Sequence, residues 1–307
     1  MQKFLPLLFL AVASSLFAGT PDVTTTATSQ NTSTLAPVPI DYIETETAYV
    51  FSSDFTSDRH NFGSQDSWQN EFEYAHRFLI SGNWYLRAGL NYDRFDFSKT
   101  DAPLPIHLQT GQLVLGLDYM HGEDVGAFIQ IRPGIYTENH INMGAFDCPI
   151  LIGRFFVIKP DELYILAAVR GSFLSGEFPV VPLAGIVWTP SKQFRIMAVP
   201  PEPRVIYSVN KGLDVWIGGE IAGRAFRTDN NPGYQLRGGK TAKLSGAVVD
   251  YTDYRAGVGF TYSPTDRLDL DFSGGYSLQR NFDFSRADQS FRTDPAPYVK
   301  MEIHAKF

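Results

Sequence analysis

The segment from Tyr298 to Phe307 alternates strictly between two kinds of side chain, and this alternation limits the fold more than any other feature of the sequence. One phase holds Val299, Met301, Ile303, Ala305 and Phe307, and the other holds Tyr298, Lys300, Glu302, His304 and Lys306. Because the side chains of a β-strand point alternately to opposite faces, one face of this strand is apolar and the other is charged. Such a strand fits the wall of a barrel with lipid outside and a polar lumen inside.

The same two-residue alternation returns in many segments between turn signals. Trp84, Leu86 and Leu90 share an apolar phase, for example, while Arg87 and Asp93 occupy the other. The apolar phase of the best-patterned segments carries no Asp, Glu, Lys or Arg, and Arg or Lys there would cost about 2–4 kcal/mol at the bilayer midplane. A soluble antiparallel sheet also alternates. Long segments, aromatic residues near their ends and glycines in the polar phase, where a lumen wall needs no filling, favour lipid contact instead.

The lengths of the turns alternate as well. Short turns occur at 81–83, 121–124, 159–162, 190–193, 210–212 and 263–266, and longer connections lie near 52–66, 97–108, 137–149, 175–181, 227–244 and 281–296. Outer-membrane barrels have short periplasmic turns and longer outer loops. With 200–203 as a further outer loop, the sequence predicts an all-β, antiparallel transmembrane β-barrel of about 14 strands, an even number as in bacterial barrels. Prolines between Pro179 and Tyr207 weaken the strand assignments there, so twelve strands is the alternative.

The N-terminal residues indicate export. A basic start at Met1–Lys3, an apolar run over Phe4–Ala13 and small residues up to Ala18 are typical of a secretory signal peptide, whose cleavage site stays open. Residues 19–40 are rich in Thr, Ser, Ala and Pro without periodicity, which is typical of a flexible leader. We therefore expect a signal peptide over 1–18, a leader over 19–40 and an outer-membrane β-barrel over 41–307. A secreted, soluble β-sandwich is the competing interpretation.

Charged residues in the polar phase are expected to face the lumen. They are Glu71, Glu73, Arg77, Arg87, Asp93, Arg132, Arg170, Glu220, Arg224, Asp253, Arg255, Asp269 and Asp271. Acidic and basic members are nearly balanced, which favours ion pairs between strands over a ring of one sign that would select ions. The loops near 137–149 and 227–244 are candidates for folding into this lumen.

Other chemistry finds little support in the sequence. Gly233–Thr241 resembles a phosphate-binding loop but has one residue too many, and the six histidines form no pair at metal-binding spacing. Loop aspartates match no calcium loop, and no nucleophile motif is present. We therefore predict no enzyme activity, no cofactor and no metal site. The net charge of −7 argues against a nucleic-acid partner.

The signal peptide, the alternating strands and the strand over Tyr298–Phe307 together resemble those of bacterial outer-membrane β-barrel proteins, and in particular the uncharacterised single-barrel families. The resemblance implies that Val299, Met301, Ile303 and Phe307 form an assembly signal read by the barrel assembly machinery. It also implies contact with outer-membrane lipid and the role of a passive pore or small-solute channel with a mixed-charge lumen, the solute being unknown. A structural or surface-interaction barrel without transport is the alternative, and an outer-membrane hydrolase is a third hypothesis.

Overall fold

The computed structural model describes residues 40–57, 60–121, 124–175, 179–230 and 244–307. The predicted signal peptide and nearly all of the predicted leader lie outside these residues, as does the near-match to a phosphate-binding loop. No helix within them is long and apolar enough to cross a membrane.

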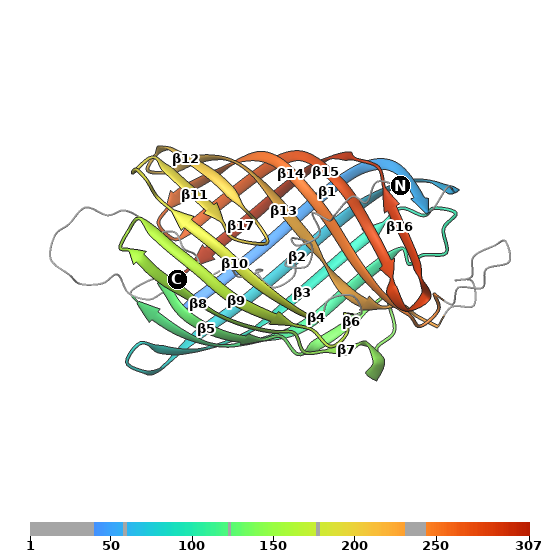
Figure 1. The fold of residues 1–307 in the computed structure, drawn as a ribbon, viewed down its shortest axis with the longest axis horizontal. Coiled ribbons are helices and arrows are strands. Elements are labelled where there is room, and N and C mark those ends of the chain that lie inside the picture. Colours follow the sequence, from blue (N-terminus) through green and yellow to red (C-terminus); the bar gives the residue numbers. More distant parts are fainter. Residues whose placement is uncertain (1–39, 58–59, 122–123, 176–178, 231–243) are drawn as a thin grey trace, which may run out of the picture.

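The described chain consists almost wholly of β-strands (Figure 1). They are β1 (Asp41–Ser57), β2 (His60–Ser81), β3 (Trp84–Phe97), β4 (His107–His121), β5 (Asp124–Ile131), β6 (Gly134–Thr137), β7 (Phe146–Asp147), β8 (Ile150–Lys159), β9 (Leu163–Gly171), β10 (Val180–Trp188), β11 (Phe194–Ala198), β12 (Arg204–Asn210), β13 (Leu213–Arg227), β14 (Val248–Thr265), β15 (Leu268–Phe284), β16 (Gln289–Thr293) and β17 (Ala296–Lys306). Two short 3₁₀-helices, η1 (Met143–Ala145) and η2 (Ser285–Ala287), lie between β6 and β7 and between β15 and β16.

These elements close into a 14-stranded antiparallel barrel, which confirms the predicted fold and strand number. Each strand pairs with its neighbours in sequence, and β1 closes the ring against β17. Three wall strands are interrupted, so that β5 and β6, β7 and β8, and β16 and β17 each make one strand of the barrel. Each interruption contains a proline, namely Pro133, Pro149 or Pro295, and proline has no N–H to give to a ladder.

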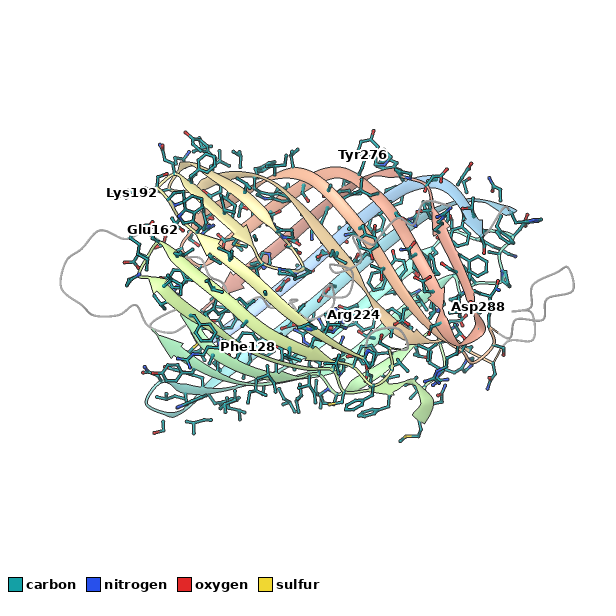
Figure 2. All side chains as sticks on the ribbon, in the orientation of Figure 1. Phe128, Glu162, Lys192, Arg224, Tyr276 and Asp288 are labelled. Atoms are coloured by element: carbon teal, nitrogen blue, oxygen red, sulfur yellow. The ribbon has the colours of Figure 1, made fainter. Side chains whose placement is uncertain are left out.

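The exterior of the barrel is apolar where the sequence alternation predicts it. On β3, Trp84 and Leu90 are 42% and 56% exposed, whereas Arg87 and Asp93 in the other phase are buried. Figure 2 shows the same contrast, since Tyr276 projects from the outer surface while Arg224 lies within the outline of the barrel. Large exposed apolar side chains over most of the strands would cost free energy in water, so this surface fits a lipid environment.

The wall is not equally tall on all sides. β2 and β14 contain 22 and 18 residues, whereas β11 and β12 contain only 5 and 7. A strand that crosses a membrane needs about 9–11 residues. The rim on the loop side is therefore lowest at the β11–β12 hairpin, and β13 continues beyond the end of its neighbour β12.

The glycines of the polar phase have a different role from the one expected. A Cβ atom at Gly89 would lie 2.0 Å from the Tyr74 carbonyl oxygen, and one at Gly259 would lie 2.5 Å from Cζ2 of Trp216. These glycines let the backbone and large side chains approach closely. The expectation that they border empty space was wrong, because the interior beside them is filled.

Candidate functional site

The candidate site is the interior of the barrel, where all thirteen predicted lumen residues lie on the inward face. Eleven of them are buried, and Glu220 and Asp269 are partly exposed. They come from β2, β3, β9, β13, β14, β15 and the break between β5 and β6. Their partners extend from neighbouring strands to strands on the opposite side of the ring.

One connection across the lumen runs through Arg224 of β13. Its guanidinium forms an ion pair with Asp93 of β3, and it lies 3.4 Å from the Glu71 carboxylate of β2. The same group donates hydrogen bonds of 3.3 Å to Asn91 and 3.5 Å to Thr110. Since β13 is far from β2 and β3 around the ring, Arg224 ties opposite walls together and narrows the passage at this level.

A second network lies around Lys300 of β17. The Lys300 ammonium is 3.2 Å from Glu46 of β1, 3.3 Å from Glu202 in the β11–β12 loop and 2.8 Å from Glu220 of β13, and it also pairs with Glu302. Three of these carboxylates, Glu46, Glu202 and Glu220, come close enough together to surround a metal ion. The Lys300 ammonium is already their cation, so the cluster is an internal ion-pair network.

Two arginines extend this network to further strands of the wall. Arg255 of β14 lies 2.7 Å from Asp253 and 3.2 Å from Glu220. Arg204 of β12 lies 2.6 Å from Glu202 and 3.0 Å from Asp271 of β15. The ion pairs therefore brace the wall between strands, as the charge balance predicts, and they also cross the interior.

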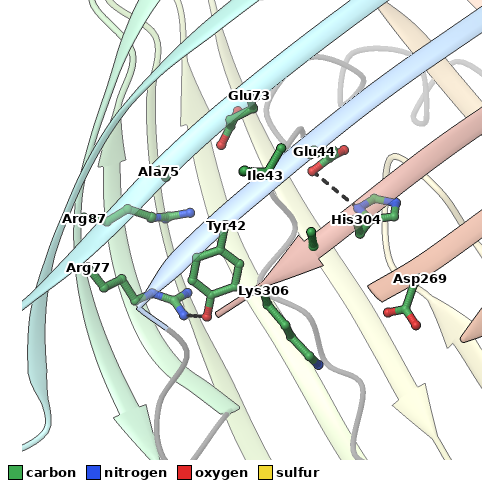
Figure 3. Close-up of a pocket in the computed structure, with 11 residues that line it drawn as sticks. Tyr42, Ile43, Glu44, Glu73, Ala75, Arg77, Arg87, Asp269, His304 and Lys306 are labelled. Atoms are coloured by element: carbon green, nitrogen blue, oxygen red, sulfur yellow. Dashed lines mark hydrogen bonds and ion pairs between the residues drawn. The ribbon is translucent and has the colours of Figure 1, made fainter. Parts of the chain in front are cut away.

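A pocket opens at the end of the barrel that carries the short turns (Figure 3). Its volume is about 580 Å³, including solvent at its opening, and we call it the mouth pocket. Arg77 reaches the Tyr42 hydroxyl there and lies 3.0 Å from Asp118. His304 of β17 lies 3.7 Å from Glu44, its cross-strand neighbour on β1. The mouth is thus lined by side chains of both charges.

A second pocket lies deeper and shares Glu44 with the mouth pocket. This inner pocket has a volume of about 420 Å³, including solvent at its opening. Five glutamates line it together with Arg224 and the apolar residues Phe95, Pro201 and Ile221; they are Glu44, Glu46, Glu71, Glu202 and Glu220. Acidic side chains therefore outnumber basic ones around this space.

The inner pocket also reaches the edge of β13. Five consecutive residues of this strand, 220–224, line it, although neighbouring residues of a strand point to opposite faces. The reason is that β12 pairs with β13 only as far as Gly218, and beyond it loop carbonyls of Pro203 and Pro201 accept the Gly219 and Ile221 N–H groups. On this side, residues 220–224 therefore lie beside a loop and not beside a paired strand.

The rest of the interior is apolar, a feature that the predicted set of charged lumen residues does not include. On the β4–β10 side, the inward side chains of Phe128, Leu151, Phe155, Leu166 and Leu183 form one buried cluster. A second cluster, which we call the outer aromatic cluster, fills the loop end of the barrel. It contains Phe55, Phe95, Phe97, Leu108, Tyr136, Phe226, Leu244, Tyr251, Phe282, Phe284 and Phe291, among others. The interior is thus amphipathic, with its ionic side chains concentrated on one side.

The two loops proposed to fold inward behave differently. In the loop near 137–149, residues 139–144 are exposed, with Ile141 and Met143 at 79% and 88%, so the tip of this loop points away from the lumen and the expectation was wrong for the tip. Of the loop near 227–244, only the two ends are described, and Leu244 packs within the outer aromatic cluster. The loops meet at the rim, where the Asp229 carboxylate lies 2.7 Å from the His140 ring and accepts the His140 backbone N–H at 3.0 Å.

Some important interior residues were missing from the predicted set. Glu44 and Glu46 alternate with Thr45 and Thr47 at the start of β1, a signal that was present in the sequence. Arg204 and Glu202 lie in the proline-rich region, where strand assignment from sequence is weakest. Their role depends on which strands face each other across the ring, and no local pattern carries that information.

The chain has the fold of a closed, antiparallel β-barrel. No protein-family model matches it, and no curated protein sequence matches it. Solved structures are similar in fold at low sequence identity. An outer-membrane channel from Pseudomonas putida F1 has 9% identity and a TM-score of 0.47, and the match covers 91% of this chain and 100% of that one.

Two other solved structures are also similar. A variant of TodX, described as a monoaromatic hydrocarbon channel, has 10% identity and a TM-score of 0.45, with 89% of this chain and 91% of that chain covered. The translocator domain of the autotransporter NalP from Neisseria meningitidis has 8% identity and a TM-score of 0.35, with coverage of 87% and 88%.

Proposed function

We propose that this protein is a small-solute channel of the bacterial outer membrane. The observation that carries the proposal is the succession of the mouth pocket and the inner pocket along the interior, with Glu44 common to both. Beyond the inner pocket, the Arg224 connection and the outer aromatic cluster restrict the path. A solute that crosses the barrel must therefore displace the Arg224 side chain or parts of the outer aromatic cluster.

The lining of the inner pocket suggests the class of solute. Lys300 and Arg224 already pair with four of its five glutamates, but acidic groups still outnumber these two cations and favour a positively charged group, while Phe95, Pro201 and Ile221 provide apolar contact. Electrostatic complementarity raises the local concentration of the matching ion and disfavours the opposite charge. We therefore propose preference for small organic cations, such as amines with a short apolar part, over anions of equal size.

Conductance of the purified barrel in a planar lipid bilayer tests this proposal. We expect small, cation-selective events, and a larger conductance for Arg224→Ala, which opens the connection between β13 and β3. Arg292→Ala is the matched control, because Arg292 is exposed on β16 at the loop end. Silence of both the wild type and Arg224→Ala at all voltages would contradict the channel. Equal permeability to matched amines and carboxylates would contradict the solute class.

A structural or surface-interaction barrel is the second candidate, and the filled interior favours it. Arg224, Lys300 and Arg255 hold the walls together in a way that suits a rigid scaffold. The outer loops would then bind a partner, and deletion of 138–145 would abolish that binding without changing conductance. In either case we propose that Val299, Met301, Ile303 and Phe307 serve the barrel assembly machinery.

A further inference from the structure

Arg154 interrupts the apolar exterior of the barrel. It lies in β8 between Ile152 and Phe156, and all three side chains are exposed. Its cross-strand partners are two alanines, Ala127 of β5 and Ala167 of β9. A basic residue therefore stands on the outward face in the middle of apolar and small neighbours.

The position of Arg154 along the strand places it deep in the apolar band. It precedes Lys159, the last residue of β8 before the turn, by five residues. With a rise of about 3.3 Å per residue and a strand tilt of about 40°, its Cα lies roughly 13 Å above this turn. The apolar band of such barrels is about 25 Å tall, so Arg154 starts near its middle.

An arginine at this depth needs a partner, because an isolated cation in hydrocarbon is unfavourable. Among the described residues, no carboxylate forms an ion pair with Arg154. Its guanidinium carbon instead lies 5.2 Å from the ring centroid of Phe156, two residues closer to the turn. The side chain therefore leans toward the turn end of the barrel, as a lipid-facing arginine does when it extends toward headgroups.

The height of the wall supports the same conclusion. β8, β9 and β10 have 10, 9 and 9 residues, which is just enough to cross a membrane, and the neighbouring β11 and β12 have fewer. A short hydrophobic wall thins the bilayer around it and brings headgroups closer to the midplane. Ala127, Ala167 and Ala184 follow one another on β5, β9 and β10 and leave room beside the guanidinium.

We propose that Arg154, together with Phe156, binds the phosphate of an anionic phospholipid in the periplasmic leaflet. The inference rests on the membrane insertion that the proposed function requires. A guanidinium matches phosphate oxygens in geometry and charge. A second copy of the chain fits less well, because the outward carboxylates Asp96, Asp250 and Asp283 lie at the loop ends of their strands.

Lipid discs of defined composition test the site. The barrel is inserted into discs of phosphatidylcholine containing a small fraction of phosphatidylglycerol, and the lipids that stay bound are measured by native mass spectrometry. We expect the wild type to retain phosphatidylglycerol selectively, and Arg154→Leu to lose this preference roughly tenfold, as expected for one charge-assisted contact. Arg154→Lys should keep part of it, and the control Arg292→Leu should keep all of it.

The other outcomes overturn the proposal in distinguishable ways. Equal retention of phosphatidylglycerol by the wild type and Arg154→Leu would contradict the lipid site without bearing on the proposed channel function. A dimer that Arg154→Leu converts to a monomer would assign this face to a second copy instead. Failure of the wild type to enter the discs would refute the membrane barrel itself, and with it both proposals.

Discussion

The connection through Arg224 gives the sharpest test of how the interior is held together. At an effective dielectric constant of about 20, an ion pair at 3.4 Å has a Coulomb energy of about 5 kcal/mol. Removal of one partner from a buried pair typically costs about 3–5 kcal/mol, since the remaining charge stays buried. Arg224→Ala should therefore lower the folding equilibrium constant roughly a hundredfold to several thousandfold.

A double-mutant cycle with Asp93→Asn separates the pair from other effects. If Arg224 and Asp93 stabilise the barrel through each other, the double variant should be less destabilised than the sum of the single variants, with a coupling of about 0.5–3 kcal/mol. The assay is denaturant unfolding of the barrel in lipid vesicles, followed by tryptophan fluorescence and by gel mobility. Additive effects, or an Arg224→Ala barrel within about 0.5 kcal/mol of the wild type, would refute the cross-lumen connection.

Four further results are expected. Neutralising Arg77, Arg87 and Arg255 together should lower the melting temperature in detergent, and an unchanged value would defeat the bracing role. Gly259→Ala should destabilise the barrel through its contact with Trp216, whereas Gly111→Ala, with no atom within 4 Å of the new Cβ, should not; equal denaturation midpoints would contradict this. Burial raises the pKa of Asp229, but hydrogen bonds from His140 outweigh it and hold the pKa below its ordinary value of 3.8. The contact between Asp229 and His140 should therefore be complete above that value and weaken as pH falls through the lower pKa of the folded state. Backbone hydrogen exchange in 138–145, corrected for the intrinsic exchange rate, should then rise at low pH in the wild type. In Asp229→Asn it should be independent of pH. Deletion of Phe307 should reduce the yield of heat-modifiable barrel in cells, and a normal yield would remove its assembly role.

Much of the architecture follows from local sequence pattern. Alternation along 84–92 and 298–306 decides which side chains face inward, and the spacing of turn residues gives the number of strands. Both depend only on neighbours along the chain, so sequence carries them. The interruptions at Pro133 and Pro149 leave this alternation intact. The interruption at Pro295 shifts it by one residue, since Thr293 and then Ala296 are buried, but it does not hide the wall strand.

Other features depend on the closed ring. The meeting of Arg224 with Asp93, and of Lys300 with Glu202, requires knowledge of which strands face each other across the interior. The shortness of β11 and β12 was hidden by prolines. Arg154 was missed because both phases of the segment 150–158 are apolar, so the alternation that identifies outward residues elsewhere is absent.

The seam at which β1 pairs with β17 to close the barrel affects how the barrel folds. Tyr42 pairs with Lys306 and Val50 with Tyr298, so the two flanks of this seam come from opposite ends of the barrel sequence. Contacts between residues so far apart in the sequence form slowly, because the chain loses conformational entropy before the contacts contribute any favourable free energy. Until the seam forms, β1 and β17 each expose a row of unpaired backbone groups, a template on which a foreign strand can add. β17 must therefore be synthesised before the barrel can close, and until then the exposed edges of β1 and β17 can pair with strands of other unfolded chains.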